Sequence, residues 1–399
     1  MRGSERGERG PFCRRRAAVA TRSLGHISTS FPRRLALGCA RHRYRARGAH
    51  AMNATAVLVT ASLATLLIAA AATDSQAGPL RERLRERMQQ RAGDGDGMRA
   101  DGMGEFGGAM SCADWSKRAD RSVERQRDRQ SGPAPDRADV AYGPAPRQRL
   151  DVFLPDGAGR GGAPVIVMVH GGGWCVGDKT MSGVVANKVA RWVSQGFVFV
   201  SANYPMVNDG ADARAQGEHI AKAAAFVQTH AAEWGGDPSK VILMGHSAGA
   251  HLVSLVNADG ELRRKHGVRP LLGTVSLDAG AIDVPTQMPN VYPFLKTRYL
   301  EAFGDSEAQW IAASPYHRLD RSAGPWLGVC STQRKDDPCS QARAYVAKSE
   351  GLGVRAAALP QPMGHGALNN SLGEDNDYTR GVEAFMATLD PAVAARLRR

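Results

Sequence analysis

The stretch of sequence that decides the fold reads Val241-Ile242-Leu243-Met244-Gly245-His246-Ser247-Ala248-Gly249-Ala250-His251-Leu252. Its first four residues are apolar, which predicts a buried strand, and the next five match the G-x-S-x-G pattern of a nucleophile elbow. Such a turn strains the backbone of its serine, and the glycines on either side let the strand and the following helix approach closely. The pattern has only three fixed positions, so other parts of the chain must supply partners for Ser247.

The chain from residue 138 to 390 alternates predicted strands and helices. The apolar runs and amphipathic stretches predict strands at 164–170, 197–204, 241–244, 272–278, 325–331 and 354–359, with helices near 183–194, 216–233, 340–350 and 377–389. A partly alternating segment, 141–155, predicts a half-buried strand ahead of them. This order indicates an α/β fold, a mostly parallel central sheet with helices on both faces.

The positive charge of the chain lies at its N-terminal end. The 399 residues carry a formal net charge of +13. Residues 1–51 contain thirteen arginines, no lysine and two glutamates, which makes +11 and leaves +2 for the remaining 348 residues. Because no basic stripe with interleaved aromatic residues follows, a nucleic-acid partner is not expected.

The segments before residue 138 predict export. An uncharged apolar run at 54–72 leads into Ser75-Gln76-Ala77, which is typical of a signal peptide spanning 52–77, so the protein is expected to be periplasmic or secreted. Met52 is then the expected true start, with 1–51 a mis-assigned leader, although no basic residue precedes the apolar run in that case. The alternative is an uncleaved membrane anchor. Residues 78–137 predict a short charged helix and a flexible linker.

A serine hydroxyl needs a base, an orienting carboxylate and oxyanion donors to act as a nucleophile. Gly171, Gly172 and Gly173 directly follow a predicted buried strand, and side-chain-free residues leave backbone N–H groups available to a developing oxyanion. Ala248, the residue after Ser247, is expected to add its own N–H.

The two motifs HGGGW (170–174) and GHSAGAHL (245–252) together resemble the α/β-hydrolase superfamily, in particular its HGGG-type esterases and lipases. The feruloyl and acetyl-xylan esterase-like and kynurenine-formamidase-like enzymes are the most similar branch. The resemblance covers about residues 138–390. It implies a serine hydrolase that cleaves carboxylic esters through a Ser-His-Asp triad and an acyl-enzyme intermediate, with no cofactor or metal.

The resemblance also implies positions for the base and the acid. His365 lies in a glycine-rich loop between the last predicted strand and the last predicted helix, where the family places its catalytic histidine. For the acid, the resemblance favours Asp337, which precedes a proline after strand 325–331, with Asp336 as the second candidate. Asp278 and Asp283, which end an earlier strand, are expected to shape the pocket instead.

Cysteine usage is consistent with export. Outside residues 1–51 the chain has four cysteines, of which Cys330 and Cys339 flank a predicted loop, while the others are Cys112 and Cys175. A disulfide between Cys330 and Cys339 is the expected pairing and would contribute roughly 2 to 3 kcal/mol by loop entropy. The cysteine spacing and the nearby histidines do not match a zinc site.

Two other functions remain open from the sequence. An amide hydrolase of the aryl formamidase type would use the same triad, because the leaving group is read by pocket residues that the motifs do not reveal. A non-catalytic binding module on the same fold is the second alternative. Oligomeric state and substrate specificity leave no signature in the sequence.

Overall fold

The computed structural model describes residues 110–126, 132–157 and 161–398. The expected leader and signal segment, and most of the segment 78–137, lie outside these ranges. Among the described residues, no helix is long and apolar enough to cross a membrane.

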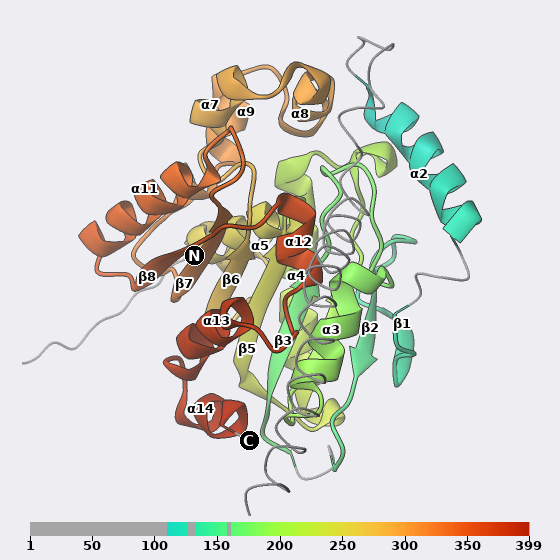
Figure 1. The fold of residues 1–399 in the computed structure, drawn as a ribbon, viewed down its shortest axis with the longest axis vertical. Coiled ribbons are helices and arrows are strands. Elements are labelled where there is room, and N and C mark those ends of the chain that lie inside the picture. The colour runs from blue at the N-terminus through green and yellow to red at the C-terminus, as the bar shows by residue number, and fades with distance from the viewer. Residues whose placement is uncertain (1–109, 127–131, 158–160, 399) are drawn as a thin grey trace, which may run out of the picture. The chain divides into compact units, whose positions relative to one another are not determined.

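An eight-stranded sheet forms the centre of the described chain, as expected for an α/β fold (Figure 1). The strand order is β1-β2-β4-β3-β5-β6-β7-β8. The first pairings, β1 with β2 and β2 with β4, are antiparallel, and all later pairings are parallel. The strands are β1 (Arg137–Ala141), β2 (Arg149–Phe153), β3 (Ala163–Val169), β4 (Val198–Ala202), β5 (Gly236–His246), β6 (Gly273–Leu277), β7 (Trp326–Ser331) and β8 (Ala356–Gln361).

The central strands are buried on both faces, which explains their continuous apolar sequences. In β3, alternate side chains enter different cores. Val165, Val167 and Val169 join the hydrophobic cluster on one face of the sheet, whereas Ile166 and Met168 join the cluster on the other face. Each such buried side chain contributes about 1.5 to 3 kcal/mol relative to exposure.

Helices cover both faces of this sheet. One face packs against α4 (Ala213–His230), α5 (Ala248–Ala258) and α11 (Pro338–Gly351), and the other against α3 (Ser182–Trp192), α13 (Asp377–Ala387) and α14 (Pro391–Leu397). Short elements connect them, namely η3 (Val207–Asp209), η4 (Ala231–Trp234), α6 (Gly260–Lys265) and α12 (His365–Asn370).

A group of short helices lies between β6 and β7 in the sequence, where the sequence pattern predicted no elements. Figure 1 shows α7, α8 and α9 grouped beyond one end of the sheet. The group consists of α7 (Val284–Gln287), η5 (Met288–Asn290), η6 (Pro293–Leu295), α8 (Lys296–Phe303), α9 (Glu307–Ala312) and α10 (Pro315–Arg318). Side-chain caps such as Ser306 and Ser314 begin these helices, and each helix is too short to show an apolar period.

The expectation of a flexible linker before residue 138 is corrected at α2 (Cys112–Gln126). A disulfide joins Cys112 to Cys175, and the Cys112 amide donates to Glu301 Oε2 at 2.6 Å. These contacts come from distant parts of the chain, so local periodicity does not report them. The other disulfide joins Cys330 to Cys339, the pairing expected from the sequence.

Candidate active site

Ser247 lies in a sharp turn between β5 and α5, with φ 56° and ψ −115°. This positive φ is strained for a non-glycine residue. Its amide donates to the Leu277 carbonyl at 2.9 Å, which ties the turn to the end of β6. A Cβ on Gly245 would lie 2.4 Å from the Gly249 carbonyl oxygen, and one on Gly249 would lie 2.2 Å from that of Val169. Only glycine permits this close approach of strand and helix.

The turn presents the serine hydroxyl to His365. Ser247 Oγ lies 2.9 Å from His365 Nε2, and His365 Nδ1 lies 2.6 Å from Asp278 Oδ2. Because an ionised carboxylate only accepts hydrogen bonds, His365 donates from Nδ1 and leaves Nε2 to accept the serine proton. The three side chains thus form a hydrogen-bonded chain of hydroxyl, imidazole and carboxylate.

Asp278 is fully buried and directly follows β6. The Ser331 amide donates to its Oδ1 at 2.8 Å, and Arg334 Nη1 donates to its Oδ2 at 3.0 Å. Burial raises the pKa of Asp278, but the His365 hydrogen bond and the charge of Arg334 oppose this and bring the pKa down to about 2. The carboxylate is therefore ionised at neutral pH.

The structure corrects the predicted position of the acid. Asp337 caps α11 by accepting from the Ser340 amide at 3.1 Å, and its side chain is 63% exposed. The other candidate, Asp336, has a buried side chain, which binds Arg334 rather than His365. Neither predicted residue reaches the imidazole, because the loop after β7 places Arg334, not a carboxylate, beside Asp278.

Asp283, which was expected to shape the pocket with Asp278, has a local role. It accepts from the backbone amide and hydroxyl of Thr286 and so begins α7. From the sequence, Asp278 was expected to line the pocket and was not expected to pair with His365. One feature of the sequence does point to Asp278. This aspartate directly follows the predicted strand that comes next after the strand of Ser247.

The glycine loop after β3 lies against the serine. A Cβ on Gly171 would be 2.9 Å from Ser247 Cβ. Gly172, Gly173 and Trp174 all have positive φ, at 120°, 57° and 65°. The Gly172 carbonyl accepts from the amides at 175 and 176, which closes the loop into a tight turn. The four expected donors, Gly171 to Gly173 and Ala248, therefore occupy two segments that flank the nucleophile.

Comparisons with known proteins point to one family. Residues 150–274 match the family model described as BD-FAE. The esterase LipQ of Mycobacterium tuberculosis is 27% identical over 250 residues, which covers 58% of this chain and 57% of LipQ. The probable carboxylic ester hydrolase LipM of the same organism is 34% identical over 222 residues, which covers 52% of this chain and 50% of LipM. The chain thus spans about half the length of these curated relatives.

A solved structure has the same fold. The crystal structure of esterase B from Lactobacillus rhamnosis matches with a TM-score of 0.55 at 20% identity, covering 71% of this chain and 94% of that chain. The chain therefore has the α/β-hydrolase fold, and its matched stretch and curated relatives are similar to the esterases and lipases of that fold. In this α/β-hydrolase the family-matched stretch begins at residue 150, so α2 and β1 precede it.

Two histidines of the quoted motifs hold the site of this α/β-hydrolase together. His251 Nδ1 accepts from Trp174 Nε1 at 3.2 Å, while its Nε2 donates to the Ala313 carbonyl at 2.7 Å. Burial lowers the pKa of His251 to about 4, so it is neutral at pH 7. His246 donates to the His365 carbonyl at 3.0 Å, and burial lowers its pKa well below the usual range. Both therefore act as uncharged supports of the turn and the base.

The motif pattern did not single out Arg334. Its guanidinium binds both Asp278 and Asp336, and its Nη1 lies 3.4 Å from His365 Nδ1. Flanking carboxylates outweigh the effect of burial and raise the pKa of Arg334, so the side chain stays charged. This positive charge favours the ionised form of Asp278.

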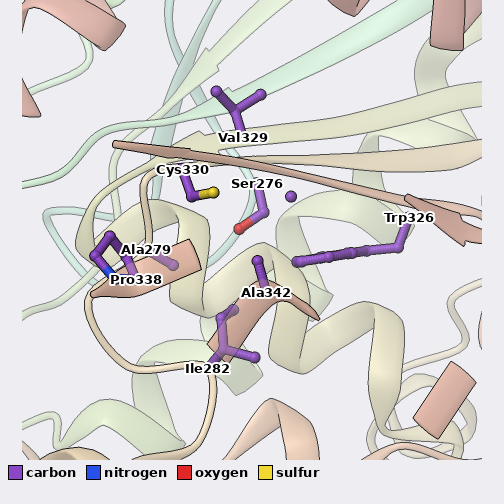
Figure 2. Close-up of a pocket in the computed structure, with 9 residues that line it drawn as sticks. Ser276, Ala279, Ile282, Trp326, Val329, Cys330, Pro338 and Ala342 are labelled. Atoms are coloured by element: carbon purple, nitrogen blue, oxygen red, sulfur yellow. The ribbon is translucent and has the colours of Figure 1, made fainter. Parts of the chain in front are cut away.

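A small cavity lies beside β6, the strand that leads to Asp278. Figure 2 shows the Trp326 ring along one side and the Ser276 hydroxyl and Cys330 sulfur near the middle of the group. The lining residues are Ser276, Ala279, Ile282, Trp326, Gly328, Val329, Cys330, Pro338 and Ala342. None of them is a free titratable group, so the cavity is a packing feature between β6, β7 and α11.

One group of side chains in the described ranges brings potential metal ligands together. Cys112, Cys175 and Glu301 bring suitable atoms within 4.8 Å of one another. The two sulfurs are joined in a disulfide, however, and a disulfide offers no thiolate to a metal. This group is therefore a covalent anchor rather than a candidate metal centre.

Proposed function

We propose that this chain hydrolyses carboxylic esters, with Ser247 as nucleophile, His365 as general base and acid, and Asp278 as the orienting carboxylate. The observation that carries the proposal is the unbroken chain of hydrogen bonds from Ser247 through His365 to Asp278, at 2.9 Å and 2.6 Å. The strained turn that exposes Ser247 supports it, as do the esterase names of the relatives.

The proposed reaction proceeds in two halves. Ser247 Oγ transfers its proton to His365 Nε2 and attacks the ester carbonyl, and His365 then donates this proton to the departing alcohol. A water molecule, deprotonated by His365, attacks the acyl-enzyme, and the carboxylic acid leaves as the serine is restored. N–H groups from Gly171 to Gly173 and from Ala248 would stabilise the tetrahedral oxyanion.

The test is Ser247→Ala, assayed with a short-chain nitrophenyl ester and with fluorophosphonate labelling. Turnover and labelling are expected to disappear together. Ser194→Ala is the matched control, because Ser194 is exposed and its hydroxyl only bonds carbonyls near the end of α3. Retained turnover in Ser247→Ala would sink the assignment. Assays of the wild type with an ester and an anilide of the same acyl group distinguish ester cleavage from amide cleavage, the alternative that would use the same three residues.

We also propose that the protein is exported. Its two disulfides, Cys112–Cys175 and Cys330–Cys339, are typical of oxidising compartments. The apolar segment at 52–77 supports the same conclusion from sequence. Cell fractionation of the native host, with mass spectrometry of the mature N-terminus, tests the proposal. Recovery of the protein in the cytosol with the apolar segment intact would contradict it.

A further inference from the structure

The helix α2 is fastened to the segment that follows the glycine loop. The Cys112–Cys175 disulfide bridges 63 positions of sequence and makes the covalent connection. Asn208 Nδ2 donates to the carbonyls of both cysteines, at 3.3 Å and 3.2 Å. On its other side, the Cys112 amide donates to Glu301 of α8. The start of α2 is therefore held by η3, α8 and the loop together.

One side chain of α2 lies directly on the glycine loop. A Cβ on Gly173 would be 2.5 Å from Trp115 Cζ3, so the indole packs against the Gly173 backbone. The Arg298 guanidinium lies over the same indole, 4.1 Å from the ring centroid. Arg298 is 7% exposed, and its Nη2 donates to the Phe294 carbonyl at 3.4 Å. Its attraction to the indole therefore helps to hold Trp115 in place.

The loop under Trp115 combines two glycines with one strained residue. Gly172 and Gly173 adopt positive φ without strain and are free to take other conformations, whereas Trp174, at φ 65°, is strained as a non-glycine residue. The Trp174 end is held from inside the protein, since its carbonyl accepts from the Val207 amide and from Gln216 Nε2. On the outer side, Trp115 covers Gly173.

We propose that Trp115 is a positioning residue for the oxyanion loop, and that the Cys112–Cys175 disulfide holds it there. This inference rests on the proposed function, because it assigns Trp115 a role in the same reaction. By packing on Gly173, Trp115 keeps the loop N–H groups aimed at the carbonyl oxygen that develops negative charge. The orientation of these N–H groups matters most in the transition state, where the negative charge develops. Its loss therefore lowers kcat more than it raises KM.

The first experiment compares Trp115→Ala with Trp115→Phe and with Lys117→Ala in the full-length protein. Lys117 is exposed on the same helix and is the matched control. We expect Trp115→Ala to lower kcat for a nitrophenyl ester by about 10- to 100-fold with KM within about threefold. Trp115→Phe should restore much of the rate, and Lys117→Ala should match the wild type. If kcat of a folded Trp115→Ala stays within about twofold of wild type, the inference is wrong.

The second experiment removes the disulfide by the double substitution Cys112→Ser and Cys175→Ser, which also serves if Trp115→Ala does not fold. We expect the same selective loss of kcat, and no additive loss when Trp115→Ala is combined with it, because both act on one loop. Equal kcat in the folded double variant and the wild type would overturn the role of the disulfide.

The wild-type protein separates this inference from the proposed function. A wild type that neither turns over esters nor reacts with a fluorophosphonate would refute the proposed function. An active wild type whose kcat is insensitive to Trp115 and to the disulfide would refute only the positioning role.

Discussion

His365 and Asp278 stand 87 residues apart in the sequence, and a 2.6 Å hydrogen bond joins His365 Nδ1 to Asp278 Oδ2. The contact crosses from the start of α12 to the end of β6. This hydrogen bond fixes the tautomer of the His365 imidazole, so that Nε2 is free to accept a hydrogen bond from Ser247. The carboxylate that meets His365 thus follows β6, the strand next to the one that ends at Ser247, rather than lying in the loop between β7 and α11.

Asp278→Asn is expected to lower kcat by about 10³- to 10⁴-fold, because an amide at this position can stabilise the wrong imidazole tautomer. The measurement is steady-state hydrolysis of a nitrophenyl ester. Asp337→Asn is the matched control and should leave kcat within about twofold, since Asp337 is exposed, caps α11 and otherwise pairs with the exposed Arg343. A large loss in Asp337→Asn, with little loss in Asp278→Asn, would restore the assignment made from the sequence.

Arg334→Met is expected to move the acidic limb of the kcat/KM profile to higher pH through Asp278. The guanidinium donates to Asp278 Oδ2 at 3.0 Å, and its charge helps to keep the pKa of that carboxyl at about 2. Without this charge the pKa of Asp278 rises, so the carboxylate that orients His365 is lost at a higher pH. Arg343→Met, at an exposed arginine of α11, is the control. Superimposable profiles for Arg334→Met and wild type would contradict the electrostatic role.

Acid is expected to destabilise the fold through His170 and His251. Burial lowers the pKa of each to about 4, against an ordinary value of 6.5. The unfolded chain therefore binds protons that the folded protein does not, so stability is full above pH 6.5 and falls as the pH drops toward 4. Each histidine contributes about 3 kcal/mol to this loss. Urea unfolding at pH 7 and at pH 4.5 measures it, and equal free energies of unfolding would contradict it.

The double substitution Cys330→Ser and Cys339→Ser is expected to lower the free energy of unfolding by about 2 to 3 kcal/mol, because the disulfide closes a short loop. The fall in kcat should be much smaller than for Asp278→Asn, since the acid lies on β6 and not in that loop. Chemical denaturation and ester turnover of the same preparations provide both readouts. A loss of kcat as large as that of Asp278→Asn would show that the loop orients the acid after all.

The local sequence predicted the positions of much of the candidate site and of most strands of the sheet. The apolar runs located β3 to β8, and the motifs located Ser247 and the glycine loop, because burial on both faces and tight turns leave direct signatures in neighbouring residues. His365 followed from its glycine-rich loop and from the family resemblance. In each case the residues that form the recognisable pattern lie within about ten consecutive positions.

Tertiary structure alone decided which carboxylate meets His365 and what covers the glycine loop. Asp278 and Asp337 each follow a buried strand, so the sequence around them does not distinguish them, and the choice depends on the direction in which the two loops leave the sheet. The place of Trp115 depends on a disulfide across 63 residues and on contacts with α8. Such contacts arise from packing between distant segments, which leaves no periodic pattern in the sequence of either segment.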